Sequence, residues 1–167
     1  NVIGTNTPDV LTEAVAEHTF ALIMAITRRI AEADKLARTQ SSSFGPEVML
    51  GMELKGKVLG VLGLGRIGSR VAEIGKAFGM NIIYYDVKLN SEFELKINAI
   101  FKSKPEELLS TSDVVSVHVP LLDSTKHLIN TERLKMMKPT SYLVNTSRGP
   151  VVDEAALVEA LKNGIIK

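Results

Sequence analysis

Residues 57–79 read KVLGVLGLGRIGSRVAEIGKAFG, and the predicted fold class follows from them. Residues 58–62 form a short apolar run, which is typical of a strand buried in a parallel sheet. Residues 66–78 carry apolar side chains at helical spacing, and Gly79 is suited to end that helix. The sequence therefore predicts a strand that passes through a glycine-rich turn directly into a helix.

Three glycines in the turn have separate physical roles. Gly63 allows a tight exit from the strand, and Gly65 lacks a side chain, so that backbone N–H groups can approach a pyrophosphate. Gly68 lets the helix pack closely on the strand. Free N–H groups and the positive end of the helix dipole then face the phosphates. The turn predicts a dinucleotide site.

The next predicted strand, residues 81–85, ends at Asp86. An acidic side chain at this position can accept hydrogen bonds from both ribose hydroxyls of the adenosine, and it repels a 2′-phosphate. We therefore expect NAD as the cofactor, with NADP disfavoured, although Lys88 is close enough to weaken the preference. The alternative interpretation is a tight turn with an unrelated surface aspartate.

Strands and helices alternate through the rest of the chain. We expect further strands at residues 99–101, 114–119 and 142–144, and helices at residues 105–109, 131–137 and 153–162. Ser103 and Glu106 suggest a capping box for the first of these helices. Such alternation predicts parallel strands joined by helical crossovers, hence a doubly wound α/β sheet. Before it, residues 13–38 predict one long helix, which a loop at residues 41–46 ends.

Composition narrows the classes of function. The 167 residues suit one domain, and 20 Lys+Arg against 19 Asp+Glu leave a charge of +1, which argues against nucleic-acid or anionic-membrane partners. There is no cysteine, so disulfides and thiolate chemistry are excluded, and we expect no metal site and a cytoplasmic location. The most apolar stretch, residues 20–26, is too short to span a bilayer.

The first residue is Asn1 and the last residues resemble the start of a strand, so we expect a piece of a longer protein.

Arg148 follows the strand at residues 142–144. A planar, permanently charged guanidinium suits a substrate carboxylate together with the adjacent carbonyl oxygen. The alternative is an ordinary surface arginine in a salt bridge.

Five separated motifs resemble, in the same order, the coenzyme domain of the D-isomer-specific 2-hydroxyacid dehydrogenases. They are Asn6-Thr7-Pro8 with residues 14–17, Gly56-Lys57 with residues 63–68, Ser112-Asp113, residues 118–121 with Thr125, and residues 145–149. The resemblance implies a two-domain enzyme. Residues 51–167 would form its Rossmann-type dinucleotide-binding core, truncated at the C-terminus, and residues 1–50 an interdomain segment and dimerisation arm.

The resemblance also implies roles for particular residues. Arg148 would be the catalytic residue that holds the substrate carboxylate and polarises the carbonyl. The cofactor-binding residues would be Gly63, Gly65, Arg66, Ile67 and Gly68 at the pyrophosphate, Asp86 at the ribose, His118, Val119, Pro120 and Thr125 along the adenosine side, and Thr146, Ser147 and Arg148 near the nicotinamide. His118 lies in a cofactor-lining motif, so we do not expect it to donate the proton. The family's acid–base pair, a Glu and a His, would lie beyond Lys167.

The expected activity is reversible hydride transfer between a nicotinamide cofactor and a small D-2-hydroxy acid or 2-oxo acid. A glyoxylate or hydroxypyruvate reductase is the first expectation and phosphoglycerate dehydrogenase the second. A non-catalytic, NAD-sensing corepressor on the same fold is the alternative from another class. The expected partners are the 2-oxo acid and a second copy of the chain, with neither nucleic acid nor membrane.

Overall fold

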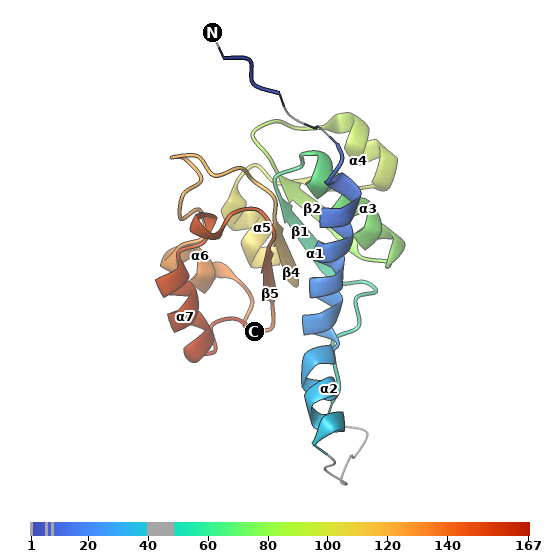
Figure 1. Ribbon diagram of the computed structural model, residues 1–167, viewed down its shortest axis with the longest axis vertical. Coiled ribbons are helices and arrows are strands. Elements are labelled where there is room, and N and C mark those ends of the chain that lie inside the picture. The colour runs from blue at the N-terminus through green and yellow to red at the C-terminus, as the bar shows by residue number, and fades with distance from the viewer. Residues whose placement is uncertain (1, 6, 8, 40–48) are drawn as a thin grey trace.

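A computed structural model describes residues 2–5, 7, 9–39 and 49–167. Its centre is a sheet of five parallel strands in the order β3-β2-β1-β4-β5 (Figure 1). In that order the strands are Ile100–Phe101, Asn81–Tyr85, Val58–Leu62, Val114–Val117 and Tyr142–Asn145. The predicted doubly wound α/β sheet is confirmed, with β4 ending two residues earlier than expected.

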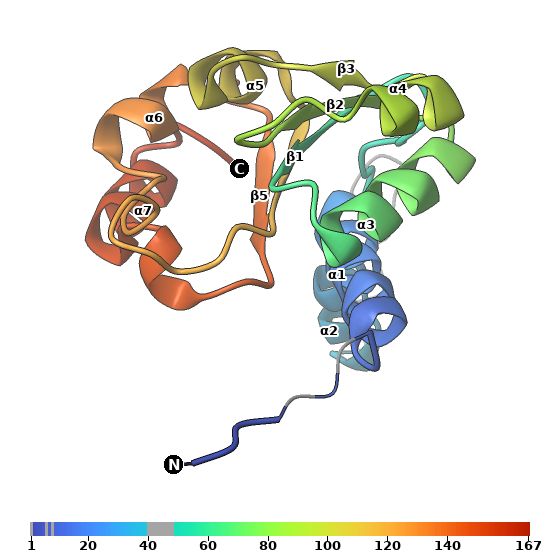
Figure 2. The same ribbon diagram turned by 90° about the horizontal axis from the view of Figure 1, so that it is seen from above.

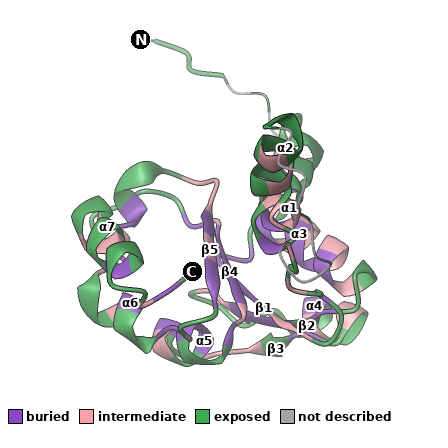
Figure 3. Ribbon diagram, turned by 90° about the horizontal axis from the view of Figure 1, so that it is seen from below, coloured by how far each residue is buried: buried purple, intermediate pink, exposed green. Residues whose placement is uncertain are grey.

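Helices cover both faces of the sheet (Figure 2). On one face lie α1 (Thr12–Thr27), α3 (Arg66–Ala77) and α4 (Ser91–Ile97), whose apolar side chains share a core with Leu59 and Val61 of β1. On the other face lie α5 (Pro105–Thr111), α6 (Thr131–Met136) and α7 (Glu154–Lys162), whose core includes Leu62. Side chains alternate along β1 because successive residues of a strand point to opposite faces. The central strands β1 and β4 are accordingly among the most buried parts of the molecule, whereas the edge strand β3 is more exposed (Figure 3).

The single helix predicted over residues 13–38 is wrong, because the structure has two helices there. Helix α1 ends at Thr27, Arg29 adopts a left-handed conformation with φ 54°, and α2 spans Ile30–Arg38. The returning chain explains the break: the Met52 amide donates to the Thr27 carbonyl at 2.7 Å, and a Cβ on Gly51 would overlap that carbonyl. The predicted loop at residues 41–46 lies outside the described residues.

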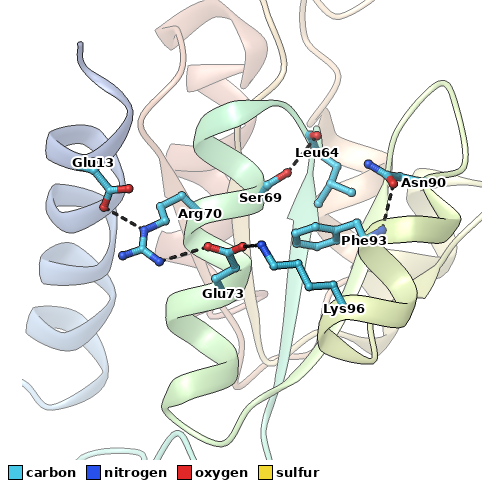
Figure 4. A network of polar contacts seen from close by, with 8 residues as sticks. All are labelled: Glu13, Leu64, Ser69, Arg70, Glu73, Asn90, Phe93 and Lys96. Atoms are coloured by element: carbon cyan, nitrogen blue, oxygen red, sulfur yellow. Dashed lines mark hydrogen bonds and ion pairs between the residues drawn. The ribbon is translucent and has the colours of Figure 1, made fainter. Parts of the chain in front are cut away.

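Helix α4 was not expected from the sequence. Its cap is Asn90, whose side chain accepts the Phe93 amide at 3.0 Å, and the Phe93 ring packs edge-on against Tyr84. Polar contacts join this helix to its neighbours (Figure 4). The chain of contacts runs from Lys96 of α4 through Glu73 and Arg70 of α3 to Glu13 of α1.

The predicted capping box at the start of α5 is also wrong. Lys104 occupies the cap position, and Ser103 Oγ donates to Glu107 Oε1 at 3.1 Å. Glu106 instead pairs with Arg133, at 2.7 Å, on α6. The carboxylate that the local sequence pattern assigns to the helix cap therefore forms an ion pair with a residue distant in the sequence.

A short 3-10 helix, η1 (Gly149–Val151), was not expected either. Within the described part of the chain, no helix is long and apolar enough to cross a membrane.

Asp113 ties the amino ends of two strands together. Its carboxylate accepts the Val58 amide at 2.8 Å and pairs with Lys138 at 2.9 Å, and its side chain is 17% exposed. Burial opposes ionisation of this carboxyl, but the Val58 amide and Lys138 outweigh burial and hold its pKa below the ordinary value.

We expect Asp113→Asn to lower the free energy of unfolding by about 1 kcal/mol at pH 7, because it removes a charge from both interactions. A folded-state pKa below the unfolded one stabilises the fold above the unfolded pKa of about 3.9, and the benefit is lost as the pH falls through the folded pKa. Urea unfolding at pH 7 and pH 3 should therefore show the difference from wild type shrinking in acid. Asp123→Asn, at an exposed position, is the matched control. Equal stability of wild type and Asp113→Asn at pH 7 would contradict this account.

Candidate dinucleotide-binding site

The glycine turn lies where β1, β2 and β4 end together. Gly63 has φ +95° and donates its amide to the Tyr85 carbonyl at 2.9 Å, and a Cβ added to it would lie only 2.9 Å from the His118 backbone. A Cβ on Gly68 would overlap the Gly63 carbonyl oxygen, whereas a Cβ on Gly65 would have no neighbour within 4 Å. Gly63 and Gly68 are thus needed by the fold itself, and Gly65 leaves its surroundings open.

A cavity of about 380 Å³ opens beside Gly65. It is lined by the turn and the first residues of α3, by His118 after β4, and by Thr7, Asp9, Leu11 and Thr12. Gly65 caps α3 without a side-chain hydrogen bond, so the first N–H groups of this 12-residue helix face the cavity. This open, amide-rich cradle fits a pyrophosphate group. Arg66 also lines the cavity, and its Nε lies 2.8 Å from Asp9 Oδ1.

A larger cavity of about 680 Å³ lies between α1, α2, α7 and the amino end of β5. Ligands of doubly wound sheets bind at the carboxyl ends of the strands. The cavity at the glycine turn is therefore the better candidate for the dinucleotide-binding site, although it is smaller than the cavity beside β5.

The side-chain carboxylate of Asp86 accepts hydrogen bonds from two backbone amides, one of them in the glycine turn. Its Oδ2 accepts the Leu64 amide at 2.7 Å, and its Oδ1 accepts the Val87 amide at 2.7 Å. Each carboxylate oxygen retains capacity for a further hydrogen bond, so the group can still accept from ribose hydroxyls. Asp86 and Lys88 both line a neighbouring cavity of about 300 Å³. The carboxylate is thus placed to shape the turn and to meet a sugar in the same position.

His118 is held as a neutral side chain. Its Nε2 lies 2.7 Å from Ser116 Oγ, and burial lowers its pKa to about 4. The imidazole therefore carries almost no positive charge at pH 7 and is poorly suited to donate a proton there. His118 lines the cavity at the glycine turn, and its contact with a cofactor there stays a prediction. Val119 beside it is buried, and Pro120 is exposed.

Thr125 stabilises the loop after His118. Its hydroxyl donates to the Pro120 carbonyl at 2.6 Å and accepts the Leu122 amide at 2.8 Å. Of the four residues expected along the adenosine side, His118 lines the cavity at the glycine turn, whereas Val119, Pro120 and Thr125 do not.

Asn145 builds the turn that carries the expected catalytic arginine, and no pattern in the sequence singled it out from the motif around it. Its Oδ1 accepts the amide and the hydroxyl of Ser147, and its Nδ2 donates to the Arg148 carbonyl at 2.9 Å. Arg148 is exposed and donates to the Ser147 carbonyl. Among the described residues it forms no ion pair with a carboxylate, so the salt-bridge alternative has no support there.

Thr146 contacts a residue that the sequence did not indicate. Its Oγ1 lies 2.8 Å from Oγ1 of Thr19, which is completely buried on α1. Thr146, Ser147 and Arg148 follow β5, two strands from β1 in the sheet, at the edge where the glycine turn also lies. The structure thus places the expected site residues in two groups along one edge of the sheet.

Comparison with known proteins gives a consistent result. Residues 20–167 match the model of the family described as D-isomer specific 2-hydroxyacid dehydrogenase, NAD binding domain. Glyoxylate reductases from Aeropyrum pernix and Thermofilum pendens are 54% and 52% identical to the chain, each over 97% of it. The crystal structure of a D-lactate dehydrogenase from Aquifex aeolicus, complexed with NAD and lactic acid, superimposes with a TM-score of 0.90 at 43% identity.

The alignments also define how much of these proteins the chain represents. It covers 50% and 48% of the two glyoxylate reductases. For the D-lactate dehydrogenase, 97% of this chain aligns with 48% of that chain. The chain therefore spans about half the length of the relatives that it matches.

Proposed function

The chain belongs to the D-isomer specific 2-hydroxyacid dehydrogenases, and we propose that it is the NAD-binding part of a reductase of small 2-oxo acids, with glyoxylate or hydroxypyruvate as substrate. The observation that carries the proposal is the exposed guanidinium of Arg148 at the carboxyl edge of the sheet, on a backbone turn that Asn145 stabilises by donating to the Arg148 carbonyl. The names of the two glyoxylate reductases favour this substrate class over 3-phosphoglycerate, and over a non-catalytic NAD sensor.

Different residues of the chain bind the cofactor and polarise the substrate carbonyl. The glycine turn and Arg66 hold the pyrophosphate, and Asp86 accepts from the adenosine ribose, which favours NAD over NADP. When bound, the reduced nicotinamide supplies the hydride. Arg148 binds the substrate carboxylate with its two-pronged donor set and polarises the neighbouring carbonyl. Because the partly buried His118 is neutral, we propose that the proton comes from a group outside this chain.

We further propose that two copies associate through the N-terminal helices. Leu22, Ile26 and Ile30 leave 36%, 37% and 51% of their surfaces exposed on α1 and α2. Apolar exposure of this kind on neighbouring helices is consistent with a homodimer interface.

Oxalate, a non-reducible mimic of a 2-oxo acid, tests the role of Arg148. We expect Arg148→Gln to weaken oxalate binding to the NADH-loaded chain by about 10- to 100-fold. This factor corresponds to the free energy that charge-assisted hydrogen bonds to a carboxylate contribute. NADH affinity should fall by a smaller factor than oxalate affinity, because most of the expected cofactor-binding residues lie outside the turn that carries Arg148. Isothermal titration calorimetry measures both.

Arg148→Lys, which keeps the charge without the planar guanidinium, is the matched control. Its oxalate affinity should lie between those of wild type and Arg148→Gln. Unchanged oxalate affinity in Arg148→Gln would contradict the proposed role. The chain alone should not oxidise NADH when glyoxylate is added, and sustained turnover by it would contradict the proposed external proton donor.

A further inference from the structure

Thr19 and Thr146 form a hydrogen bond between helix α1 and the end of β5. The two residues are distant in the sequence, and their hydroxyl oxygens lie 2.8 Å apart. Thr19 is completely buried, whereas Thr146 is partly exposed at the carboxyl edge of the sheet. The buried partner therefore determines how the accessible hydroxyl is oriented.

The direction of this hydrogen bond follows from a third atom. Thr19 Oγ1 also lies 2.7 Å from the Val15 carbonyl oxygen, which can only accept. A hydroxyl has one proton, so Thr19 donates to Val15 and Thr146 must donate to Thr19. The proton of Thr146 is thereby used, and its hydroxyl can offer a ligand only lone pairs.

The position of Thr146 indicates which ligand group it meets. In a doubly wound sheet the two halves each bind one mononucleotide of a dinucleotide. The glycine turn and Asp86 belong to the first half, so the end of β5 belongs to the half that receives the nicotinamide nucleotide. The polar substituent of the nicotinamide ring is an uncharged carboxamide, which can both donate and accept.

We propose that Thr19 is a positioning residue that fixes the Thr146 hydroxyl as an acceptor for the amino group of the nicotinamide carboxamide. This inference rests on the proposed NAD binding, and it adds a determinant of selectivity to the site. An acceptor-only hydroxyl favours the carboxamide over a carboxylate, which has no proton to donate, and over an acetyl group. The chain should therefore discriminate against deamido-NAD, in which a carboxylate replaces the amide, and against the acetylpyridine analogue.

Thr19→Val tests the proposal because it keeps the shape of the buried side chain and frees the Thr146 proton. We expect the ratio of NAD to deamido-NAD affinity to fall by about tenfold, as Thr146 becomes able to donate to the carboxylate. The ratio of NAD to acetylpyridine analogue should fall by a smaller factor. Thr19→Ser retains the hydroxyl and should restore the wild-type ratios. Calorimetric titration of the full chain with the three dinucleotides gives these values.

Thr27→Val is a matched control. Thr27 is also completely buried on α1 and donates to the carbonyl four residues earlier, Ile23, at 2.7 Å, but no distant hydroxyl among the described residues contacts it. Its replacement removes the same kind of intrahelical bond, so general loosening of α1 should affect both variants. The selectivity ratios should change only in Thr19→Val.

A second measurement needs no ligand. Thermal unfolding of wild type, Thr19→Val, Thr146→Val and the double variant forms a cycle, and non-additive melting temperatures are expected because the two hydroxyls interact. Non-additivity with unchanged selectivity ratios would reduce the contact to a structural one and overturn the proposal, as would additive effects. If the wild-type chain bound none of the dinucleotides, the proposed function itself would fail, and this inference with it.

Discussion

Replacing Gly65 with alanine is expected to weaken NADH binding by about 10- to 100-fold while leaving the free energy of unfolding within about 0.5 kcal/mol of wild type. A Cβ at this position meets no atom of the protein within 4 Å, and the backbone of Gly65 is extended, so the fold tolerates the methyl group. The same methyl group enters the space where the pyrophosphate approaches the first N–H groups of α3. Calorimetry with NADH and urea unfolding of the free chain separate the two effects.

Gly68→Ala is the matched variant, because it adds the same methyl group three residues later. Its Cβ would overlap the Gly63 carbonyl oxygen and lie 3.2 Å from a methyl group of Val61, so the turn or the helix must move. We expect a loss of about 1–3 kcal/mol in the free energy of unfolding. A fall in stability for Gly65→Ala as large as for Gly68→Ala would show that the fold does not tolerate the methyl group at Gly65. Unchanged NADH affinity in Gly65→Ala would show that the turn is not the pyrophosphate site.

The contrast between these glycines illustrates why the turn could be predicted from the sequence. A strand, a GxGxxG spacing and a helix are local features, and each depends on residues close together in the chain. Asp86 was found for a related reason, since it ends the next strand and neighbouring parallel strands meet at one edge. Periodicity and turn chemistry thus predicted the sheet, and they placed the glycine turn and Asp86 at its carboxyl edge, where their binding roles stay predictions.

The features that the sequence did not predict depend on distant residues. The break between α1 and α2 involves Gly51 and Met52, which cross the end of α1. The apolar pattern continues through the break, and no local signal marks it. Thr19 looks like an ordinary helical residue until the fold brings Thr146 against it. Helix α4 differs, because its Asn90 cap was present in the sequence as a recognised helix-start signal.

Asp86→Asn is expected to lower the ratio of NADH to NADPH affinity by about 100-fold. The variant loses charge-assisted hydrogen bonds to the ribose hydroxyls, worth about 1.5–3 kcal/mol each, and it no longer repels a 2′-phosphate. An asparagine has nearly the same shape. Its one carbonyl oxygen can still accept the Leu64 amide, so the turn should persist, while the hydrogen bond from the Val87 amide is lost. Parallel calorimetric titrations with NADH and NADPH give the ratio.

Lys88→Ala serves as the opposing control for this ratio. Lys88 lines the same cavity as Asp86, and its positive charge favours a 2′-phosphate, so its removal should raise the ratio of NADH to NADPH affinity. The two variants also distinguish whether Asp86 acts by recognising the ribose or by stabilising the glycine turn. If Asp86→Asn weakened NADH and NADPH equally, the carboxylate would act only through the Leu64 amide, and the preference for NAD would have to arise elsewhere in the site. A fall confined to NADH, with NADPH affinity unchanged or increased, assigns the selectivity to the charge of Asp86.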